Sequence, residues 1–181
     1  TINFNPDIII CTHSFPAAII SRLKQKKRIE CPLVTVVTDF NIHSSYINDN
    51  TDYYVIPHEY LTYIMESFGV PKEKVLSFGI PIRKEFCESY NREELLAKLG
   101  YEDKKTILVM GGGLGLGGIN NIVKAIDSYM EDIQIIAVAG RNNRLEAKLK
   151  DLSTKNKLVV YGFVNNMHEL MELSDCIISK P

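Results

Sequence analysis

Several features that mark whole classes of protein are absent from the sequence. Its four cysteines are far apart, form no Cys-x-x-Cys pair and have no histidine at zinc-finger spacing, which indicates neither a disulfide framework nor a structural metal site and fits a reducing cytoplasm. The formal net charge of −1 removes the electrostatic basis for non-specific binding to nucleic acid. The sequence has no run of about 18 apolar residues and no basic segment followed by an apolar one, so we expect neither a membrane-spanning helix nor a signal peptide. Any contact with a membrane is therefore expected to be peripheral.

Short β-branched runs alternate with segments of helical periodicity along the 181 residues. This alternation predicts parallel sheets covered by helices on both faces, and therefore an α/β fold. The predicted strands are residues 8–11, 33–37, 53–56, 75–78, 106–110, 134–139, 158–161 and 176–179. Apolar side chains recur with helical spacing in two further segments, residues 61–68 and 119–130.

A domain boundary is predicted close to Pro81. This proline interrupts the pattern where one series of strands ends and the next begins, which divides the chain into two lobes, residues 1–82 and 83–181. The sequence opens near a strand without an initiator Met and closes on a strand, so we expect both lobes to be truncated. The expectation matters because ligands of open α/β sheets bind beyond the carboxyl ends of the strands.

Residues 111–118 contain six glycines in eight positions, after a predicted strand and before a predicted amphipathic helix. A backbone without Cβ atoms lets a ligand approach closely, and a helix N-terminus offers unpaired N–H groups to a phosphate. The loop therefore predicts a diphosphate site. The alternative is a glycine cluster that only forms a tight turn.

The same loop also matches the dinucleotide fingerprint Gly-x-Gly-x-x-Gly at Gly113, Gly115 and Gly118. A site for NAD would need an acidic residue after the next strand, where Arg141 stands instead. Arg141 would suit the 2′-phosphate of NADP, so an NADP-dependent oxidoreductase stays open. The position of the loop argues against it, because several strands precede this loop whereas the fingerprint usually opens its domain.

Two further loops are expected at the same edge of the sheet as the glycine-rich loop, because each follows a parallel strand. In the first, Arg141 stands next to Gly140 and can neutralise a phosphate. In the second, Phe163 can face a base, and Val164 can offer its backbone polar groups to that base. Met167 either contacts the ligand or packs in the core, as Met in a helix usually does.

Together these stretches resemble one family of enzymes. The donor-side motifs are Met-Gly-Gly-Gly-Leu-Gly at 110–115, Ala-Gly-Arg-Asn at 139–142, Gly-Phe-Val at 162–164 and Ile-Ser-Lys-Pro at 178–181. The acceptor-side motifs are Asn-Pro-Asp-Ile-Ile at 5–9, Thr-His at 12–13, Val-Thr-Asp-Phe at 37–40 with His43, and Phe-Gly-Ile-Pro-Ile at 78–82. Over nearly the whole chain, the sequence resembles the monogalactosyldiacylglycerol synthases and processive diacylglycerol glucosyltransferases.

The resemblance implies two Rossmann-like lobes of the GT-B type, with the C-terminal part of an acceptor-binding lobe in residues 1–82 and the N-terminal part of a nucleotide-sugar donor lobe in residues 83–181. It implies a bacterial hexosyltransferase that passes a sugar from a UDP-sugar to diacylglycerol with inversion. The resemblance implies no metal, which agrees with the absence of an Asp-x-Asp motif, and no cofactor besides the UDP-sugar co-substrate. It places the enzyme in the cytoplasm, peripherally at the inner face of an anionic cell membrane. The transferase that adds N-acetylglucosamine to a lipid-linked peptidoglycan precursor shares the general fold, and it ranks lower because of residues 38–40 and His43.

The resemblance also assigns site residues. Asp39 and His43 fall on the acceptor side and are the candidates for catalytic groups, and Asp39 can orient His43 if the loop between them turns helically. The donor-binding residues are Gly112, Gly113, Leu114, Gly115, Gly140, Arg141, Phe163, Val164 and Met167. The family has a further His in an N-terminal glycine-rich loop that this chain lacks, so we expect no turnover from the isolated chain.

Three more features concern the acceptor side. The family often has Trp three residues after His43, where this sequence has Tyr46, and we expect Tyr46 to keep an aromatic contact with the membrane. His13 either lines the cleft or caps the helix that follows it. A basic run either ends a helix in solvent or meets anionic lipid headgroups. It consists of Lys24, Lys26, Lys27 and Arg28.

Overall fold

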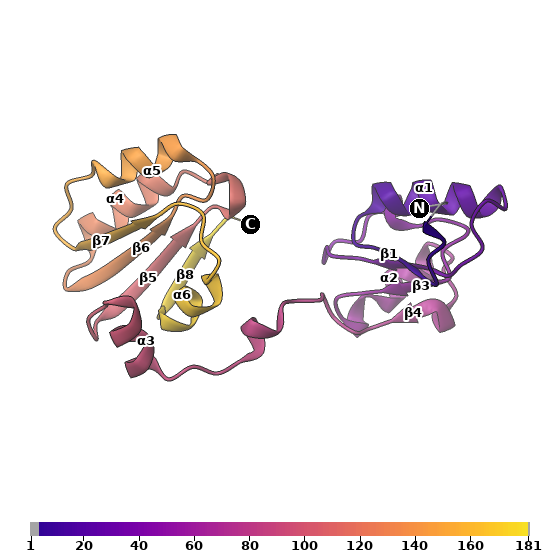
Figure 1. Ribbon diagram of the computed structural model, residues 1–181, viewed down its shortest axis with the longest axis horizontal. Helices are drawn as coiled ribbons and strands as arrows, with labels where there is room; N and C mark the ends of the chain where they lie inside the picture. Colours follow the sequence, from indigo (N-terminus) through magenta and orange to yellow (C-terminus); the bar gives the residue numbers. More distant parts are fainter. Residues whose placement is uncertain (1–3, 181) are drawn as a thin grey trace. The chain divides into compact units, whose positions relative to one another are not determined.

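The computed structural model describes residues 4–180, and the chain forms two compact units, Thr1–Ile82 and Arg83–Pro181. Each unit has a parallel sheet and helices of its own (Figure 1). Pro181, the last residue of the donor-side motif at 178–181, lies outside the described residues. Within residues 4–180, none of the helices is long and apolar enough to cross a bilayer.

The first unit contains a four-stranded sheet in the order β1-β2-β3-β4, and every neighbouring pair is parallel. Its strands are β1 (Ile9–Cys11), β2 (Leu33–Val36), β3 (Tyr53–Val55) and β4 (Val75–Leu76). The helical elements are α1 (Ser14–Gln25), η2 (Ser44–Tyr46), η3 (Glu59–Leu61), α2 (Thr62–Ser67) and η4 (Lys72–Lys74), of which those labelled η are 3₁₀ turns.

Two apolar clusters hold this unit together. One lies between α1 and the first two strands, where Ala17 and Ile20 of the helix are buried against Leu33. The other lies around β3 and α2, where Tyr54 and Met65 are almost fully buried. Burial of such side chains contributes about 1.5–3 kcal/mol each before entropy is counted. The two clusters fix the strand order, and with it the edge at which the loops after the strands emerge.

The second unit contains a parallel sheet in the order β7-β6-β5-β8. Its strands are β5 (Lys105–Met110), β6 (Ile133–Val138), β7 (Lys157–Tyr161) and β8 (Cys176–Ser179). The helical elements are η5 (Lys84–Cys87), α3 (Arg92–Leu99), η6 (Gly112–Leu114), α4 (Ile119–Tyr129), α5 (Asn143–Lys150) and α6 (Met167–Leu173). Figure 1 shows α4 and α5 on one side of this sheet, with α3 and α6 on the other.

The two faces of this sheet use alternate residues of each strand. Ile107 and Val109 of β5 pack under α4 and α5, whereas Leu108 packs under α3 and α6. Side chains of successive strand residues point to opposite faces, so β5 has to be apolar throughout. Polar residues set the limits of α3, because the Asn91 side chain accepts N–H bonds at its start and Gly100 adopts the left-handed conformation at its end.

The strand order of the second unit reverses at β5. The chain runs from β5 outward through β6 to β7 and then returns to place β8 on the other side of β5. In open parallel sheets, ligands bind beyond the carboxyl ends of the strands at such a reversal. The glycine-rich loop follows β5 and Lys180 follows β8, so these two segments flank the reversal.

Candidate functional site

The glycine-rich loop after β5 contains glycines that the fold itself requires. Gly115 and Gly140 have positive φ angles of 60° and 62°. A Cβ atom on Gly140 would come within 2.6 Å of the Gly112 carbonyl oxygen, and one on Gly115 would collide with the Ala139 carbonyl oxygen. The main chain of Arg141 also donates to the Gly113 carbonyl at 2.8 Å. The loops after β5 and β6 are thus packed backbone to backbone, and no side chain fits between them.

Other glycines of the same loop face open space. A Cβ atom on Gly113 or Gly118 would meet nothing within 4 Å, and both residues are exposed. A ligand can therefore reach the backbone at these positions without a change in the fold. The two interpretations of the loop, a tight turn and a phosphate site, apply to different glycines within it.

Unpaired main-chain donors continue this open surface into α4. Among residues 4–180, the N–H groups of Gly117, Gly118, Ile119 and Asn120 have no hydrogen-bond acceptor, whereas the next amide bonds to the Gly118 carbonyl. The side-chain oxygen Oδ1 of Asn120 is also buried without a partner, in a residue that is only 6% exposed. Unsatisfied buried polar groups cost about 1–3 kcal/mol each, so this end of α4 suits a polar ligand.

The loops after β6 and β7 bring two predicted site residues together. The guanidinium carbon of Arg141 lies 4.8 Å from the centre of the Phe163 ring, and both side chains are exposed. Cation–π stacking of this kind orients the arginine as a flat surface. Val164 and Met167 instead pack partly buried against the cluster under α3 and α6, which favours the packing interpretation of Met167.

Lys180 belongs to this edge although it is not among the predicted donor contacts. A Cβ atom on Gly117 would lie 3.5 Å from Lys180 Cβ, and one on Gly112 would lie 3.5 Å from Lys180 Cε. The lysine side chain thus extends along the glycine-rich loop from one glycine to the other. The sequence signal for this role is the position of Lys180 directly after β8, the strand that follows the reversal of the strand order.

On the acceptor side, the expected pairing of Asp39 with His43 is not formed. Asp39 Oδ2 accepts a hydrogen bond of 2.7 Å from the Tyr46 hydroxyl, while His43 Nδ1 accepts from the Ser45 N–H at 3.2 Å. Within residues 4–180, no hydrogen bond or ion pair joins the two predicted residues, because the segment between them is not helical. The condition under which Asp39 would orient His43, a helical turn between them, is therefore not met.

Tyr46 occupies the core of the first unit. It is only 4% exposed, and its hydroxyl also lies 3.5 Å from Thr38 Oγ1. Burial raises the pKa of Tyr46 and the Asp39 carboxylate raises it further, so the hydroxyl remains a donor. The expected contact of Tyr46 with a membrane is wrong, since the side chain is directed at Asp39 instead.

Three histidines at the carboxyl ends of strands share one arrangement. His13, His43 and His58 each accept, through Nδ1, the N–H of the residue two positions later. This arrangement makes His13 the cap of α1, which supports the capping interpretation. Over the part of the chain that the structure describes, none of the three Nε2 atoms has a hydrogen-bond partner.

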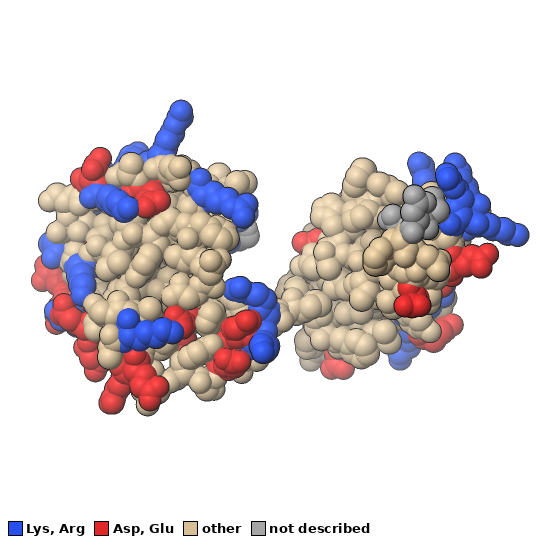
Figure 2. Space-filling view, in the orientation of Figure 1, with Lys and Arg blue, Asp and Glu red and all other residues tan. Residues whose placement is uncertain are grey.

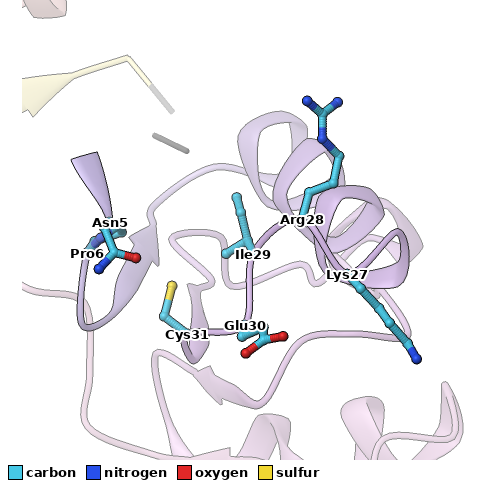
Figure 3. A pocket seen from close by; sticks show the side chains of 7 residues that line it. All are labelled: Asn5, Pro6, Lys27, Arg28, Ile29, Glu30 and Cys31. Carbon is cyan, nitrogen blue, oxygen red and sulfur yellow. The ribbon is translucent and has the colours of Figure 1, made fainter. Parts of the chain in front are cut away.

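The basic run at the end of α1 divides into two parts. Lys24 Nζ is held by Asp52 at 2.6 Å and by the Cys31 carbonyl at 2.8 Å, so its charge is used within the fold. Lysine and arginine side chains gather at this end of the first unit in Figure 2. Lys27 and Arg28 border a pocket of about 300 Å³, and both residues are exposed. Figure 3 shows their side chains pointing away from Pro6 and Cys31, which line the same pocket.

Comparisons with known sequences match both parts of the chain. Residues 2–82 match the family described as monogalactosyldiacylglycerol (MGDG) synthase, and residues 106–180 match the glycosyltransferase family 28 C-terminal domain. The chain is 34% identical over 181 residues to a processive diacylglycerol beta-glucosyltransferase of Bacillus cereus (strain B4264), a match that covers 97% of this chain and 46% of the relative. The chain therefore spans about half the length of the curated relatives it matches.

Comparisons with solved structures agree on the fold. Anabaena Alr3699/HepE in complex with UDP-glucose superposes with a TM-score of 0.61 at 14% identity, over 94% of this chain and 52% of that one. The UDP-N-acetylglucosamine 2-epimerase of Rickettsia bellii gives a TM-score of 0.54 at 17% identity, over 97% of this chain and 52% of that one. At these identities the likeness shows the fold alone, which is the Rossmann-like GT-B type predicted from the sequence.

Proposed function

The chain belongs to the family of monogalactosyldiacylglycerol synthases and processive diacylglycerol glucosyltransferases, and from this premise we propose that the protein carrying it transfers a hexose from a UDP-sugar to diacylglycerol. The transfer inverts the anomeric centre and uses neither a metal ion nor a cofactor besides the UDP-sugar. The first unit contributes to the acceptor side and the second to the donor side.

The observation that carries the donor side of this proposal is the open part of the glycine-rich loop. Gly113 and Gly118 leave the backbone accessible, and the unpaired N–H groups at the start of α4 point to an anionic partner. A diphosphate fits these donors because each of its oxygens accepts hydrogen bonds. The position beside the strand-order reversal supports the same assignment.

The base of the nucleotide belongs at the ends of β6 and β7. Arg141 and Phe163 form an exposed stacked pair there, which offers a flat surface to a uracil ring. The backbone of Val164 lies in the same loop and supplies polar groups for the edge of the ring. Specificity for uracil would then come from the backbone, and affinity from stacking.

On the acceptor side, Asp39 is the residue best placed to receive the proton of the acceptor hydroxyl. Its Oδ2 is fixed by Tyr46, which leaves Oδ1 for a substrate, and the residue is exposed after β2. Within the described residues, Nε2 of His43 has no hydrogen-bond partner and lies in the same segment, so it can hold a second hydroxyl of the acceptor. The acceptor oxygen then attacks the anomeric carbon while the diphosphate departs.

The proposal also includes a contact between the first unit and a membrane. Lys26, Lys27 and Arg28 are exposed at the end of α1, and they suit the anionic surface of the inner leaflet in a bacterial cell. This assignment places the protein at the cytoplasmic side of the membrane as a peripheral enzyme. Lys24 is excluded from this role because Asp52 already binds it.

Calorimetric titration of the chain with UDP and, separately, with NADPH tests the donor side. Saturable binding of UDP without binding of NADPH is expected, since Gly115, the central glycine of the dinucleotide fingerprint, serves packing between loops. Binding of NADPH alone would overturn the proposal in favour of an oxidoreductase. A second titration, with UDP-glucose against UDP-galactose, then identifies the hexose.

A further inference from the structure

We propose that Lys180 is the cation that neutralises the diphosphate of the nucleotide-sugar, whereas Arg141 acts at the base end of the same ligand. The assignment rests on the proposed function, because it presupposes a nucleoside diphosphate on the glycine-rich loop. It differs from the expectation drawn from the sequence, in which Arg141 is the cation that meets the phosphates beside the helix N-terminus.

The position of Lys180 is the first observation that supports it. The side chain lies along the loop, with Cβ near Gly117 and Cε near Gly112, each 3.5 Å from where a Cβ atom on the glycine would stand. The side chain therefore extends from Gly117 to Gly112, the residue next to the open Gly113. Lys180 and this loop come from β8 and β5, the two strands that flank the reversal.

The charge of Lys180 is also uncommitted. Six other lysines of the second unit form ion pairs with carboxylates. They are Lys98, Lys104, Lys105, Lys150, Lys155 and Lys157. Over residues 4–180 no carboxylate lies within ion-pair distance of Lys180. A lysine held beside unpaired N–H groups without an acidic partner is suited to an anion supplied by a ligand.

Arg141 is committed elsewhere. Its main chain is tied to the Gly113 carbonyl at 2.8 Å, and its guanidinium group is stacked on Phe163 at the ends of β6 and β7. In the strand order, β6 separates β7 from β5, whereas β8 is hydrogen-bonded to β5 directly. The stacked guanidinium thus belongs to the base, and Lys180 is the cation next to the diphosphate.

The chemistry gives Lys180 a specific task. In the transfer, the bond between the anomeric carbon and the β-phosphate oxygen breaks, and its electron pair stays on the diphosphate. A bond from the acceptor oxygen to the anomeric carbon forms as the acceptor proton passes to a base. The ammonium group of Lys180 and the N–H groups of Gly117 to Asn120 meet the charge that develops on the leaving oxygen.

The buried Asn120 side chain independently indicates that a ligand binds at the start of α4. Its Oδ1 atom has no partner, although the residue is 94% buried in the first turn of α4. The Nδ2 group of the same amide donates to Asn121 Oδ1 at 3.4 Å, so Oδ1 alone lacks a partner among the described residues, and a buried acceptor without a donor is costly. A donor group of the bound sugar, or the amide turned to donate to a phosphate, would satisfy it.

Calorimetric titrations of the chain with UDP and with uridine separate the two cations. We expect Lys180→Ala to weaken UDP binding about tenfold or more and to leave uridine binding unchanged, because a charge-assisted hydrogen bond is lost only from the diphosphate. Arg141→Ala is expected to weaken both ligands by a similar factor. Lys124→Ala removes an exposed lysine of α4 and serves as the charge-matched control with unchanged affinity for both.

The outcomes distinguish this inference from the proposed function. If the unaltered chain binds UDP and Lys180→Ala binds it equally well, the assignment of Lys180 is wrong and the proposed function stands. If the unaltered chain binds no UDP, both fail. Retention of most of the UDP affinity by Lys180→Arg would support a role for the charge, whereas a loss equal to that of the alanine variant would refute it.

Discussion

The glycine-rich loop after β5 contains glycines that the fold requires and glycines that face open space, and alanine substitutions distinguish the two kinds. Gly115 has φ of 60° and faces the Ala139 carbonyl, with the Asn142 Cβ and a Leu145 methyl group each 3.1 Å from the position of an added Cβ. An alanine at this position would have to adopt the left-handed conformation, which costs about 1–2 kcal/mol. The collision with the backbone adds strain of a similar size, so Gly115→Ala should destabilise the second unit by about 2–4 kcal/mol.

Gly113→Ala is the matched control. Its φ is not positive and its Cβ would enter open space, so the variant should be as stable as the parent or gain about 0.4–1 kcal/mol from lower entropy of the unfolded chain. The same methyl group stands where the ligand approaches, and it should weaken UDP binding. Gly115→Ala and Gly113→Ala are therefore expected to separate stability from binding.

Hydrogen exchange of amides in β6 measures the stability of the second unit by itself. Ile135 and Ile136 are fully buried, so their exchange reports opening of this sheet. A loss of about 2–4 kcal/mol accelerates exchange roughly 30-fold to 900-fold where exchange follows global opening. Parental exchange rates in Gly115→Ala would refute the argument that these loops are packed backbone to backbone.

Three further predictions concern the first unit. Tyr46→Phe should lower its free energy of unfolding by about 1 kcal/mol through loss of the hydrogen bond to Asp39. Tyr54→Phe should cost at least as much, because the Tyr54 hydroxyl donates to the Asn48 carbonyl and accepts from the Asn48 N–H; denaturant titrations compare the two variants. If Asp39 receives the acceptor proton, Tyr46→Phe in the full-length protein lowers kcat at unchanged donor KM while Tyr54→Phe does not. Equal kcat values for the two full-length variants would contradict this role. Burial raises the pKa of Asp52, but hydrogen bonds from the first amide of β2 and from Lys24 outweigh it and hold the pKa below its ordinary value. The resulting stabilisation is present above the ordinary Asp pKa, near 3.9, and is lost as the pH falls through the lower folded-state pKa. Asp52→Asn should remove this pH dependence from unfolding curves measured from about pH 5 to 2. An unchanged pH profile in the variant would count against the argument.

The strands could be predicted closely from the sequence. Each of the eight predicted segments overlaps an observed strand, and the bounds differ by no more than two residues. The largest difference is at β4, predicted as 75–78 and observed as Val75–Leu76, because the chain leaves the sheet before Gly79. Buried parallel strands are continuous apolar runs, and that signal is local in the sequence.

The site residues were predicted less well because their roles depend on contacts between distant segments. The sequence shows six glycines in one loop, but only the packing of Ala139 and Gly140 against them distinguishes Gly115 from Gly113. Tyr46 was expected at the surface, yet the turn at η2 directs it to Asp39. The motif at 178–181 contains Lys180 but assigns it no role, because its place beside the loop follows from the pairing of β8 with β5.

The central claim is that a UDP-sugar binds at the carboxyl edge of the second sheet. Amide chemical shifts of the ¹⁵N-labelled chain titrated with UDP test it most directly. The account predicts saturable shifts at Gly113, at Gly117 to Asn120 and at Phe163, with Gly100 at the opposite edge unchanged. Shifts confined to the opposite edge, or none at saturating UDP, would contradict it.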